Sequence, residues 1–207
     1  MIAVVDYGVG NLYSLTCSLR HIGADCIVTN DEQMLRDADR IILPGVGAFD
    51  DAANKLRSLK MDQLLSELVI KKGKPLMGIC LGMQLLFEQS LEFGVHQGLG
   101  FIGGTIRPLS DALTNQAKVP HMGWNSLAFV KANDPLLQET KEGDFVYYVH
   151  SYYATDCESS LVATSNYCGV QVPGVVRHAN VCGTQFHPEK SGEIGLRMLH
   201  VFAAEKD

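Results

Sequence analysis

Short apolar runs alternate with amphipathic helical patterns through the first 90 residues, and this alternation is the strongest constraint on the fold. The predicted strands are residues 2–6, 24–29, 39–45 and 74–79, and the predicted helices are residues 11–22, a short segment after Asp31, and residues 50–59, 61–71 and 81–87. Buried strands joined by crossover helices form a parallel sheet. The pattern therefore predicts an α/β fold with a mostly parallel central sheet and helices on both faces.

From about Gly94 the pattern changes to shorter β-rich runs separated by glycine and proline. These runs are residues 104–109, 124–130, 144–154, 160–167 and 174–186. They predict antiparallel strands and hairpins appended to the parallel sheet, followed by a closing helix over about residues 192–204. No repeat, low-complexity tract or linker interrupts the 207 residues, so we expect a single domain spanning residues 1–207.

Charge and hydropathy narrow the kinds of partner. The net charge is −6 and no Lys/Arg cluster is present, so we expect neither nucleic acid nor an anionic membrane as a partner. No apolar run approaches membrane-spanning length, and the N-terminus lacks the basic region of a secretory signal. We therefore expect a cytoplasmic protein.

The six cysteines are scattered through apolar segments and form no C-x-x-C pair, so a disulfide framework is not expected. The seven histidines lack ligand-type spacing, which predicts no metal site. Gly8-Val9-Gly10 lacks the third glycine of a dinucleotide fingerprint, so no cofactor is expected. Most of the cysteines are expected to be small core residues.

Cys80 stands between two glycines where a predicted strand changes to a predicted helix. The segment Gly78-Ile79-Cys80-Leu81-Gly82 has the form of a nucleophile elbow. In such an elbow a sharp turn exposes one side chain, and the glycines relieve the crowding around it. The pattern favours Cys80 as a nucleophile over a packing role, with the backbone N–H of Leu81 directed at an oxyanion.

A thiol nucleophile needs a base and a group that orients the base. His187 and Glu189 are two residues apart, so they would project to one side of an extended strand. His150 is a rival base, but no carboxylate lies within five residues of it. We therefore predict that His187 is the base and that Glu189 orients it.

The loop Pro44-Gly45-Val46-Gly47 follows the third predicted strand, at the same end of the sheet as Cys80. Glycines in such a loop let main-chain amides approach a substrate. We predict that Val46 and Gly47, together with Leu81, supply the oxyanion donors. An ordinary turn is the alternative for this loop taken alone.

The segments LPGVGAF, GICLGMQ and QFHPEKS resemble, in order and spacing, the oxyanion, nucleophile and His-Glu segments of the class I (triad) glutamine amidotransferases. More narrowly, DYGVGNLYS, HMGWN and YYVHSYY resemble the branch formed by glutaminase subunits of imidazole glycerol phosphate synthases. The resemblance spans essentially the whole chain and implies the flavodoxin-like fold of that family.

By this resemblance, Cys80 attacks the side-chain amide of glutamine, ammonia leaves, and the γ-glutamyl thioester is hydrolysed with the help of His187 and Glu189. The positions that the resemblance implies for holding glutamine are Gly47, Gln84, Glu92, His150, Ser151 and Tyr152. Gln84 lies one helical turn after Cys80, so it can face the same cleft. Glu92 is a candidate for the α-ammonium group, with a solvated loop charge as the alternative.

A glutaminase alone would waste glutamine, so we expect the acceptor chemistry on a partner. The resemblance implies a heterodimer with a (β/α)₈-barrel cyclase, which uses the ammonia to form imidazole glycerol phosphate and aminoimidazole carboxamide ribotide in histidine biosynthesis. The interface positions that it implies are Asn11, His121, Met122, Trp124, Asn125 and Lys190. Trp124 is the only tryptophan, a type that is common at interface hot spots but more often part of a core.

Three alternatives remain open from the sequence. A sister glutaminase could serve another acceptor, such as an amino-sugar pathway enzyme, with an identical catalytic set. A non-catalytic interaction module is disfavoured by the presence of Cys80, His187 and Glu189 together. A cysteine peptidase or γ-glutamyl hydrolase would act alone on larger substrates.

Overall fold

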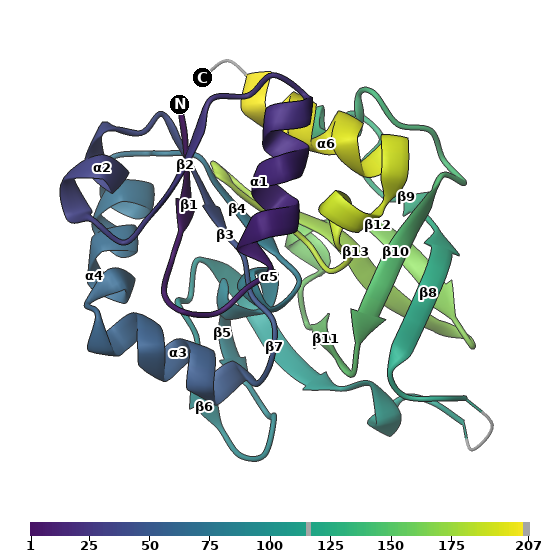
Figure 1. The fold of residues 1–207 in the computed structure, drawn as a ribbon. Helices are drawn as coiled ribbons and strands as arrows, with labels where there is room; N and C mark the ends of the chain where they lie inside the picture. The colour runs from purple at the N-terminus through teal and green to yellow at the C-terminus, as the bar shows by residue number, and fades with distance from the viewer. Residues whose placement is uncertain (115–116, 205–207) are drawn as a thin grey trace.

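A computed structural model describes residues 1–114 and 117–204 of the chain. Within these residues the centre is an eight-stranded sheet of order β2-β1-β3-β4-β14-β13-β12-β9 (Figure 1). Its strands, in chain order, are β1 Ile2–Val5, β2 Cys26–Thr29, β3 Arg40–Leu43, β4 Leu76–Ile79, β9 Ala128–Phe129, β12 Leu161–Tyr167, β13 Val170–His178 and β14 Val181–Thr184. The helices are α1 Leu12–His21, α2 Glu32–Asp37, α3 Phe49–Ser58, α4 Met61–Leu65, α5 Leu81–Leu85 and α6 Gly192–Ala204, with a π-helical turn η1 Ser66–Lys71 after α4.

The part of this sheet from β2 to β14 is parallel, as the alternating pattern predicts. Alternate side chains of β1 enter two separate cores because successive residues of a strand face opposite ways. Ile2 and Val4 pack in the core that includes α1 and α6, whereas Ala3 and Val5 pack in the core of α2, α3 and α4. Figure 1 shows these two groups of helices on opposite sides of the sheet, which is the predicted covering of both faces.

The last strands are only partly as predicted. β12 and β13 are antiparallel, and β13 and β14 form the expected hairpin. However, β14 also pairs in parallel with β4, with Thr184 opposite Ile79, so it belongs to the parallel part of the sheet. The backbone N–H of Cys80 donates to the carbonyl of Thr184 at 2.8 Å. This pairing brings the segment after Thr184 directly beside Cys80.

In the described part of the chain, two smaller sheets hold the remaining strands (Figure 1). One pairs β8 His121–Ser126 with β10 Phe145–His150, and the other contains β5 Phe87–Ser90, β6 His96–Gln97, β7 Ile102–Pro108 and β11 Tyr152–Thr155. Short 3₁₀ turns are η2 Leu109–Asp111, η3 Pro135–Leu137, η4 Glu158–Ser160 and η5 Pro188–Lys190. The predicted continuous run 144–154 is therefore broken at Ser151, where the chain leaves one sheet and enters another.

The predicted helix over residues 81–87 is too long. α5 ends at Leu85, and Phe87 begins β5. The carbonyls of Leu85 and Leu86, which a longer helix would use internally, accept hydrogen bonds from the backbone of Leu99 and Phe101. Tertiary pairing therefore ends the helix where its own side-chain pattern would let it continue.

No helix among the described residues is long and apolar enough to cross a membrane. The carboxyl ends of β1, β3, β4 and β14 lie along one edge of the central sheet. Ligands of open α/β sheets bind at this edge.

Candidate active site

A cavity of about 340 Å³ opens at the carboxyl edge of the central sheet, near the turn from β10 to β11. It brings together the predicted nucleophile Cys80, the predicted base His187, the oxyanion candidates Val46, Gly47 and Leu81, and the glutamine-holding candidates Gln84, Glu92, His150, Ser151 and Tyr152. A cavity of this size suits a small polar substrate. These predicted positions, which lie far apart in the sequence, therefore surround one space.

Cys80 occupies a strained turn between β4 and α5. Its φ is +54° and its ψ is −112°, a conformation that residues with a side chain rarely adopt. The flanking glycines are required by space. A Cβ on Gly82 would lie 1.9 Å from the carbonyl oxygen of Leu43, and a Cβ on Gly78 would lie 2.7 Å from the carbonyl oxygen of Gly82. The predicted elbow is therefore present, and it is packed directly against the end of β3.

His187 and Glu189 meet at a distance of 2.8 Å between Nδ1 and Oε1, and both side chains are buried. Their route to this contact differs from the prediction. Residues 188–190 form a 3₁₀ turn, not an extended strand, and the turn folds Glu189 back onto the ring. Pro188 sets the start of this turn because its ring fixes the backbone φ.

The charge state of His187 follows from these neighbours. Burial lowers the pKa of the ring, but hydrogen bonds and charge interactions with Cys80 and Glu189 outweigh burial and raise the pKa to about 10. At neutral pH the ring is therefore an imidazolium between the sulfur and the carboxylate.

The loop after β3 lines the same cavity as Cys80. Gly47 has a φ of +98°, which its lack of a side chain permits, whereas Val46 is not among the residues with positive φ. Val46, Gly47 and Leu81 all line the cavity. The loop is held close to the elbow, since a Cβ on Gly45 would lie 2.8 Å from the backbone nitrogen of Gly82.

Glu92 is not a solvated loop charge. Its side chain is buried, and Oε2 accepts a hydrogen bond from the backbone N–H of Phe49 at 2.7 Å. Burial raises the pKa of this carboxyl group. A carboxylate that is partly desolvated and faces a cavity gains from the arrival of an ammonium group, which is the predicted role.

His150, the rival base, is held in a different network. Its Nδ1 lies 2.9 Å from the carbonyl oxygen of Tyr152, and its Nε2 lies 2.8 Å from Nδ1 of His121. Burial lowers the pKa of His150 to about 3 and that of His121 to about 4, so both rings are neutral at pH 7. His150 has no carboxylate partner in these contacts, which favours His187 as the base.

Gln185 was not predicted as a site residue. It is fully buried, and its Nε2 lies 3.9 Å from the sulfur of Cys80. Its Oε1 accepts a hydrogen bond from Nε2 of Gln84 at 3.0 Å. The only signal in the sequence was an amide residue after the apolar run VCGT and two positions before His187.

A family model described as glutamine amidotransferase class-I matches residues 3–205. The chain belongs to the class-I glutamine amidotransferase family. The match spans all three segments that meet at the cavity.

Several relatives within this family carry the same name. The imidazole glycerol phosphate synthase subunit HisH of Bacillus velezensis is 50% identical over 205 residues, covering 98% of this chain and 95% of that protein. The subunit of the same name from Bacillus subtilis is 48% identical over 205 residues, covering 98% of this chain and 95% of that protein. The identity therefore extends over nearly the whole of both chains.

Solved structures share the class-I amidotransferase fold at lower identity. A chain of PurLQS from Thermotoga maritima has a TM-score of 0.73 at 21% identity, covering 97% of this chain and 96% of that chain. The glutaminase domain of CTPS from Trypanosoma brucei has a TM-score of 0.68 at 16% identity, covering 100% of this chain and 94% of that chain. At these identities the comparison establishes the fold alone.

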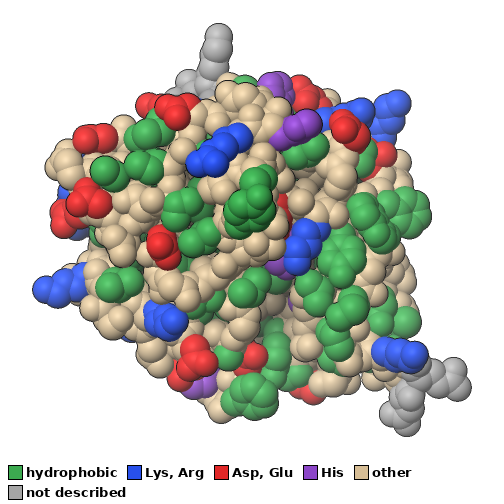
Figure 2. Space-filling view, viewed as in Figure 1, with side chains coloured by type: hydrophobic (Ala, Val, Ile, Leu, Met, Phe, Trp, Pro, Cys, Tyr) green, Lys and Arg blue, Asp and Glu red, His purple; other side chains and the backbone are tan. Residues whose placement is uncertain are grey.

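Four of the six predicted partner residues lie on or behind one surface. Met122 and Trp124 on β8 are 61% and 55% exposed, whereas His121 is buried behind them. Asn125 is half-buried, and its Nδ2 donates to the carbonyl of Asn166 at 2.9 Å. Figure 2 shows hydrophobic side chains gathered on this face of the molecule, over the region where β8 and β10 lie in Figure 1.

The other two predicted partner residues lie close to the active-site cavity. Lys190 is exposed and lines it. Asn11 is half-buried and caps α1, because its Oδ1 accepts from the backbone N–H of Ser14 at 3.3 Å. Asn11 also shares a small cavity with Glu189.

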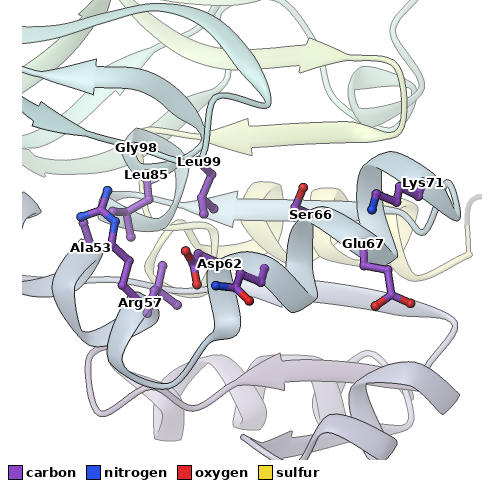
Figure 3. Close-up of a pocket in the computed structure, with 11 residues that line it drawn as sticks. Ala53, Arg57, Asp62, Ser66, Glu67, Lys71, Leu85, Gly98 and Leu99 are labelled. Carbon is purple, nitrogen blue, oxygen red and sulfur yellow. The ribbon is translucent and has the colours of Figure 1, made fainter.

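A second cavity, of about 420 Å³, lies between α3, the segment formed by α4 and η1, and residues 98–99. Figure 3 shows Arg57 and Lys71 near its two ends, with Asp62 between them. No cysteine or histidine lines it. The predicted nucleophile and base line the cavity at Cys80 and not this one. Among the residues that the structure describes, no cluster of His, Cys, Asp and Glu is arranged to hold a metal ion.

Proposed function

We propose that this protein is the glutaminase subunit of an imidazole glycerol phosphate synthase, which hydrolyses glutamine at Cys80 and delivers ammonia to a cyclase subunit. The observation that carries the proposal is that the elbow cysteine and His187 line one cavity, with His187 bonded to Glu189, in a class-I family member. The choice of this synthase is supported by relatives of that name that are 48% and 50% identical to the chain.

In the proposed reaction the starting state is a Cys80 thiolate beside a His187 imidazolium. The sulfur attacks the side-chain amide carbon of glutamine, so a C–S bond forms and negative charge develops on the amide oxygen. The backbone N–H groups of Leu81 and of the Val46–Gly47 loop stabilise this charge. A single oxyanion donor contributes about 10²–10³ in rate.

His187 then donates its proton to the amide nitrogen, the C–N bond breaks and ammonia leaves. The neutral ring next takes a proton from a water molecule while the water oxygen attacks the γ-glutamyl thioester. The C–S bond breaks, glutamate is released, and the thiolate and imidazolium are restored. Glu189 accepts from Nδ1 throughout, which keeps Nε2 of the ring toward the reacting atoms.

Glutamine is proposed to lie in the 340 Å³ cavity, with Glu92 facing its α-ammonium group. The corner at Ser151 supports this pose, since His150, Ser151 and Tyr152 turn there from one sheet to another and line the cavity together. Gln84 has less freedom than a simple substrate contact, because its Nε2 already donates to Tyr152 and to Gln185.

The acceptor subunit is proposed to be a (β/α)₈-barrel cyclase that docks on the face of Met122 and Trp124, with Asn11, Asn125 and Lys190 at its edge and His121 behind it. Exposed aromatic and methionine side chains are typical of interface cores, which supports this face. Ammonia would then pass from the cavity into the partner. The barrel uses it to form imidazole glycerol phosphate and aminoimidazole carboxamide ribotide.

Two further features belong to the proposal. Residues 1–207 are proposed to form a single domain, which accords with a family match over residues 3–205. A cytoplasmic location accords with the state of the cysteines, since no two of them form a disulfide among the described residues.

The test is an assay of glutamate release from free glutamine by the chain alone, by the chain with a candidate barrel cyclase, and by the complex with the cyclase ligand. We expect turnover to depend on Cys80, so Cys80→Ala should abolish glutamate release and still bind the cyclase. Turnover by Cys80→Ala, or turnover of γ-glutamyl peptides in preference to glutamine, would contradict the proposal. Turnover with an amino-sugar synthase in place of the cyclase would instead identify a sister glutaminase.

The docking face has its own test. Trp124→Ala should weaken binding of the cyclase by about 10- to 100-fold, the range of a central aromatic contact. Ile70→Ala is a matched control, because Ile70 is also 55% exposed but lies on η1. Equal binding by both variants would remove Trp124 from the interface.

A further inference from the structure

Gln185 lies beside the nucleophile without touching solvent. Two contacts involve its side-chain amide: Nε2 lies 3.9 Å from the sulfur of Cys80, and Oε1 lies 3.0 Å from Nε2 of Gln84. A fully buried amide is retained only where its polar atoms find partners. The contacts of Gln185 are therefore with the nucleophile on one side and with a cavity residue on the other.

The orientation of this amide is fixed by a backbone group. Nε2 of Gln84 donates to the carbonyl oxygen of Tyr152 at 3.1 Å, and a backbone carbonyl can only accept. The second N–H of Gln84 then points to Gln185, which must present its oxygen there. The remaining end of Gln185, its NH₂ group, consequently faces the sulfur.

The carbonyl of Tyr152 that sets this order is itself held in place. It also accepts from Nδ1 of His150 at 2.9 Å. Because His150 is neutral and uses its proton at Nδ1, its Nε2 accepts from Nδ1 of His121 at 2.8 Å. Nε2 of His121 then accepts from Nδ2 of Asn125 at 3.3 Å. The donor and the acceptor of each hydrogen bond from Asn125 to Tyr152 are therefore determined.

The sulfur has one partner for each of its protonation states. As a thiol, Cys80 can donate to the carbonyl oxygen of Val149, which lies 4.0 Å away. As a thiolate it would be repelled by that oxygen and would accept from the N–H of Gln185 instead. The imidazolium of His187 supplies charge for the thiolate, whereas Gln185 supplies a directed neutral donor.

We propose that Gln185 is a positioning residue, whose amide is oriented through Gln84 and Tyr152 and donates an N–H to the Cys80 thiolate, holding the sulfur ready for attack. The proposal rests on the proposed function of Cys80 as the glutaminase nucleophile. It adds a residue that the triad and the oxyanion donors do not include.

The test measures the rate of iodoacetamide alkylation at Cys80 as a function of pH in the full chain. The readout is mass spectrometry of the Cys80 peptide, because Cys17 and Cys168 are also exposed to the reagent. Gln185→Met keeps the volume and removes the donor. Its alkylation at pH 7 should be about tenfold slower, with the midpoint of the pH curve moved upward, since a hydrogen bond to a charged group is lost.

Two more variants separate this role from packing. Gln185→Glu keeps the acceptor for Gln84 but turns a carboxylate toward the sulfur, so its midpoint should move further than that of Gln185→Met. Gln84→Met leaves Gln185 in place but removes the bond that orients it, so its midpoint should move in the same direction by less. The double variant Gln84→Met/Gln185→Met should behave like Gln185→Met alone.

Gln89→Met is the matched control. Gln89 is partly buried and its Nε2 donates to Thr105 at 3.3 Å, on β5 outside the cavity lining. Its alkylation curve should match that of the native chain. In glutaminase assays of the cyclase complex, Gln185→Met should lower kcat by about tenfold and leave KM within about twofold, because the lost contact is to the nucleophile and not to substrate.

An unchanged alkylation midpoint in Gln185→Met and Gln185→Glu would overturn the proposal. If both variants fail to fold, Gln84→Met decides the question, and its having the native midpoint would have the same meaning. Failure of the proposed function looks different: Cys80→Ala would then keep turning over glutamine, whatever the alkylation curves show.

Discussion

Replacement of Glu189 by glutamine addresses the charge arrangement on which the proposed mechanism depends. In the native chain, Oε1 of Glu189 accepts from Nδ1 of His187 at 2.8 Å, whereas Oε2 is buried and has no hydrogen-bond partner among the described residues. A glutamine can present its oxygen to Nδ1 only by placing its NH₂ group at the position of Oε2. The opposite orientation would set an N–H donor against a ring nitrogen that must itself donate.

The size of the effect follows from these contacts. A hydrogen bond with a charged partner contributes about 1.5–3 kcal/mol, which corresponds to about 1–2 pKa units. The pKa of His187 in Glu189→Gln should therefore fall from about 10 by that amount. Loss of the same interaction from the transition state should lower kcat by about 10- to 100-fold.

The assay is an NMR titration of histidine labelled at Cε1, with His187 assigned by comparison with His187→Gln. The second measurement is the pH profile of glutamate release. Glu193→Gln is a matched control, because Glu193 is an exposed carboxylate only four residues further along the chain. A titration midpoint that stays near the native value in Glu189→Gln would refute the reasoning, since the carboxylate would then contribute nothing to holding the proton.

Further predictions concern packing and pH. Gly82→Ala should destabilise the chain by about 1–3 kcal/mol and suppress glutaminase activity, because the new Cβ would lie 1.9 Å from the carbonyl oxygen of Leu43. Thermal melting measures the loss of stability. Gly103→Ala is the control, because a Cβ at Gly103 meets nothing within 4 Å. Stability should also fall in acid. Burial lowers the folded-state pKa values of His121 and His150 to about 4 and about 3. The contribution of these neutral rings to the free energy of unfolding is therefore fully present above their unfolded pKa near 6.5. It is lost as pH falls below that value, by about 1.4 kcal/mol per pH unit for each ring. His187 does not offset this loss, because the stability from its raised pKa is constant below pH 6.5 and declines only as pH rises toward about 10. Urea unfolding at pH 7.5 and pH 5 measures how the free energy of unfolding depends on pH, and equal free energies at the two pH values would contradict this prediction.

Local patterns in the chain were sufficient for the first half of the fold. The strand and helix periods of β1 to β4 and the closing helix α6 are local signals, and each was predicted close to its observed bounds. The elbow at Cys80 was also predictable, because its pattern of glycine on both sides of the cysteine lies within five residues, although the crowding that requires Gly82 comes from Leu43 on β3. The strand and helix periods depend on interactions within a few residues.

The errors arose where a distant segment decided the local structure. Phe87 is not helical because backbone N–H groups of residues 99–102 donate hydrogen bonds to the carbonyls at and just after the end of α5. Glu189 reaches His187 through a 3₁₀ turn, although an extended strand was expected. The sequence does not identify Gln185 as a site residue, because its role depends on contacts with Gln84 and Cys80, which lie 101 and 105 positions away in the chain.

The sequence alone determined the layer order of the fold and the chemical types present at the site, because both follow from side-chain period and residue identity. Only the tertiary structure decided which of those groups lie in contact and which of them are charged. The pairing of β14 with β4 sets Gln185 and His187 against Cys80. Cys80 and Glu189 then keep His187 a cation against the effect of burial, whereas burial leaves His121 and His150 neutral. The cost of a buried charge depends on neighbours that no local pattern specifies.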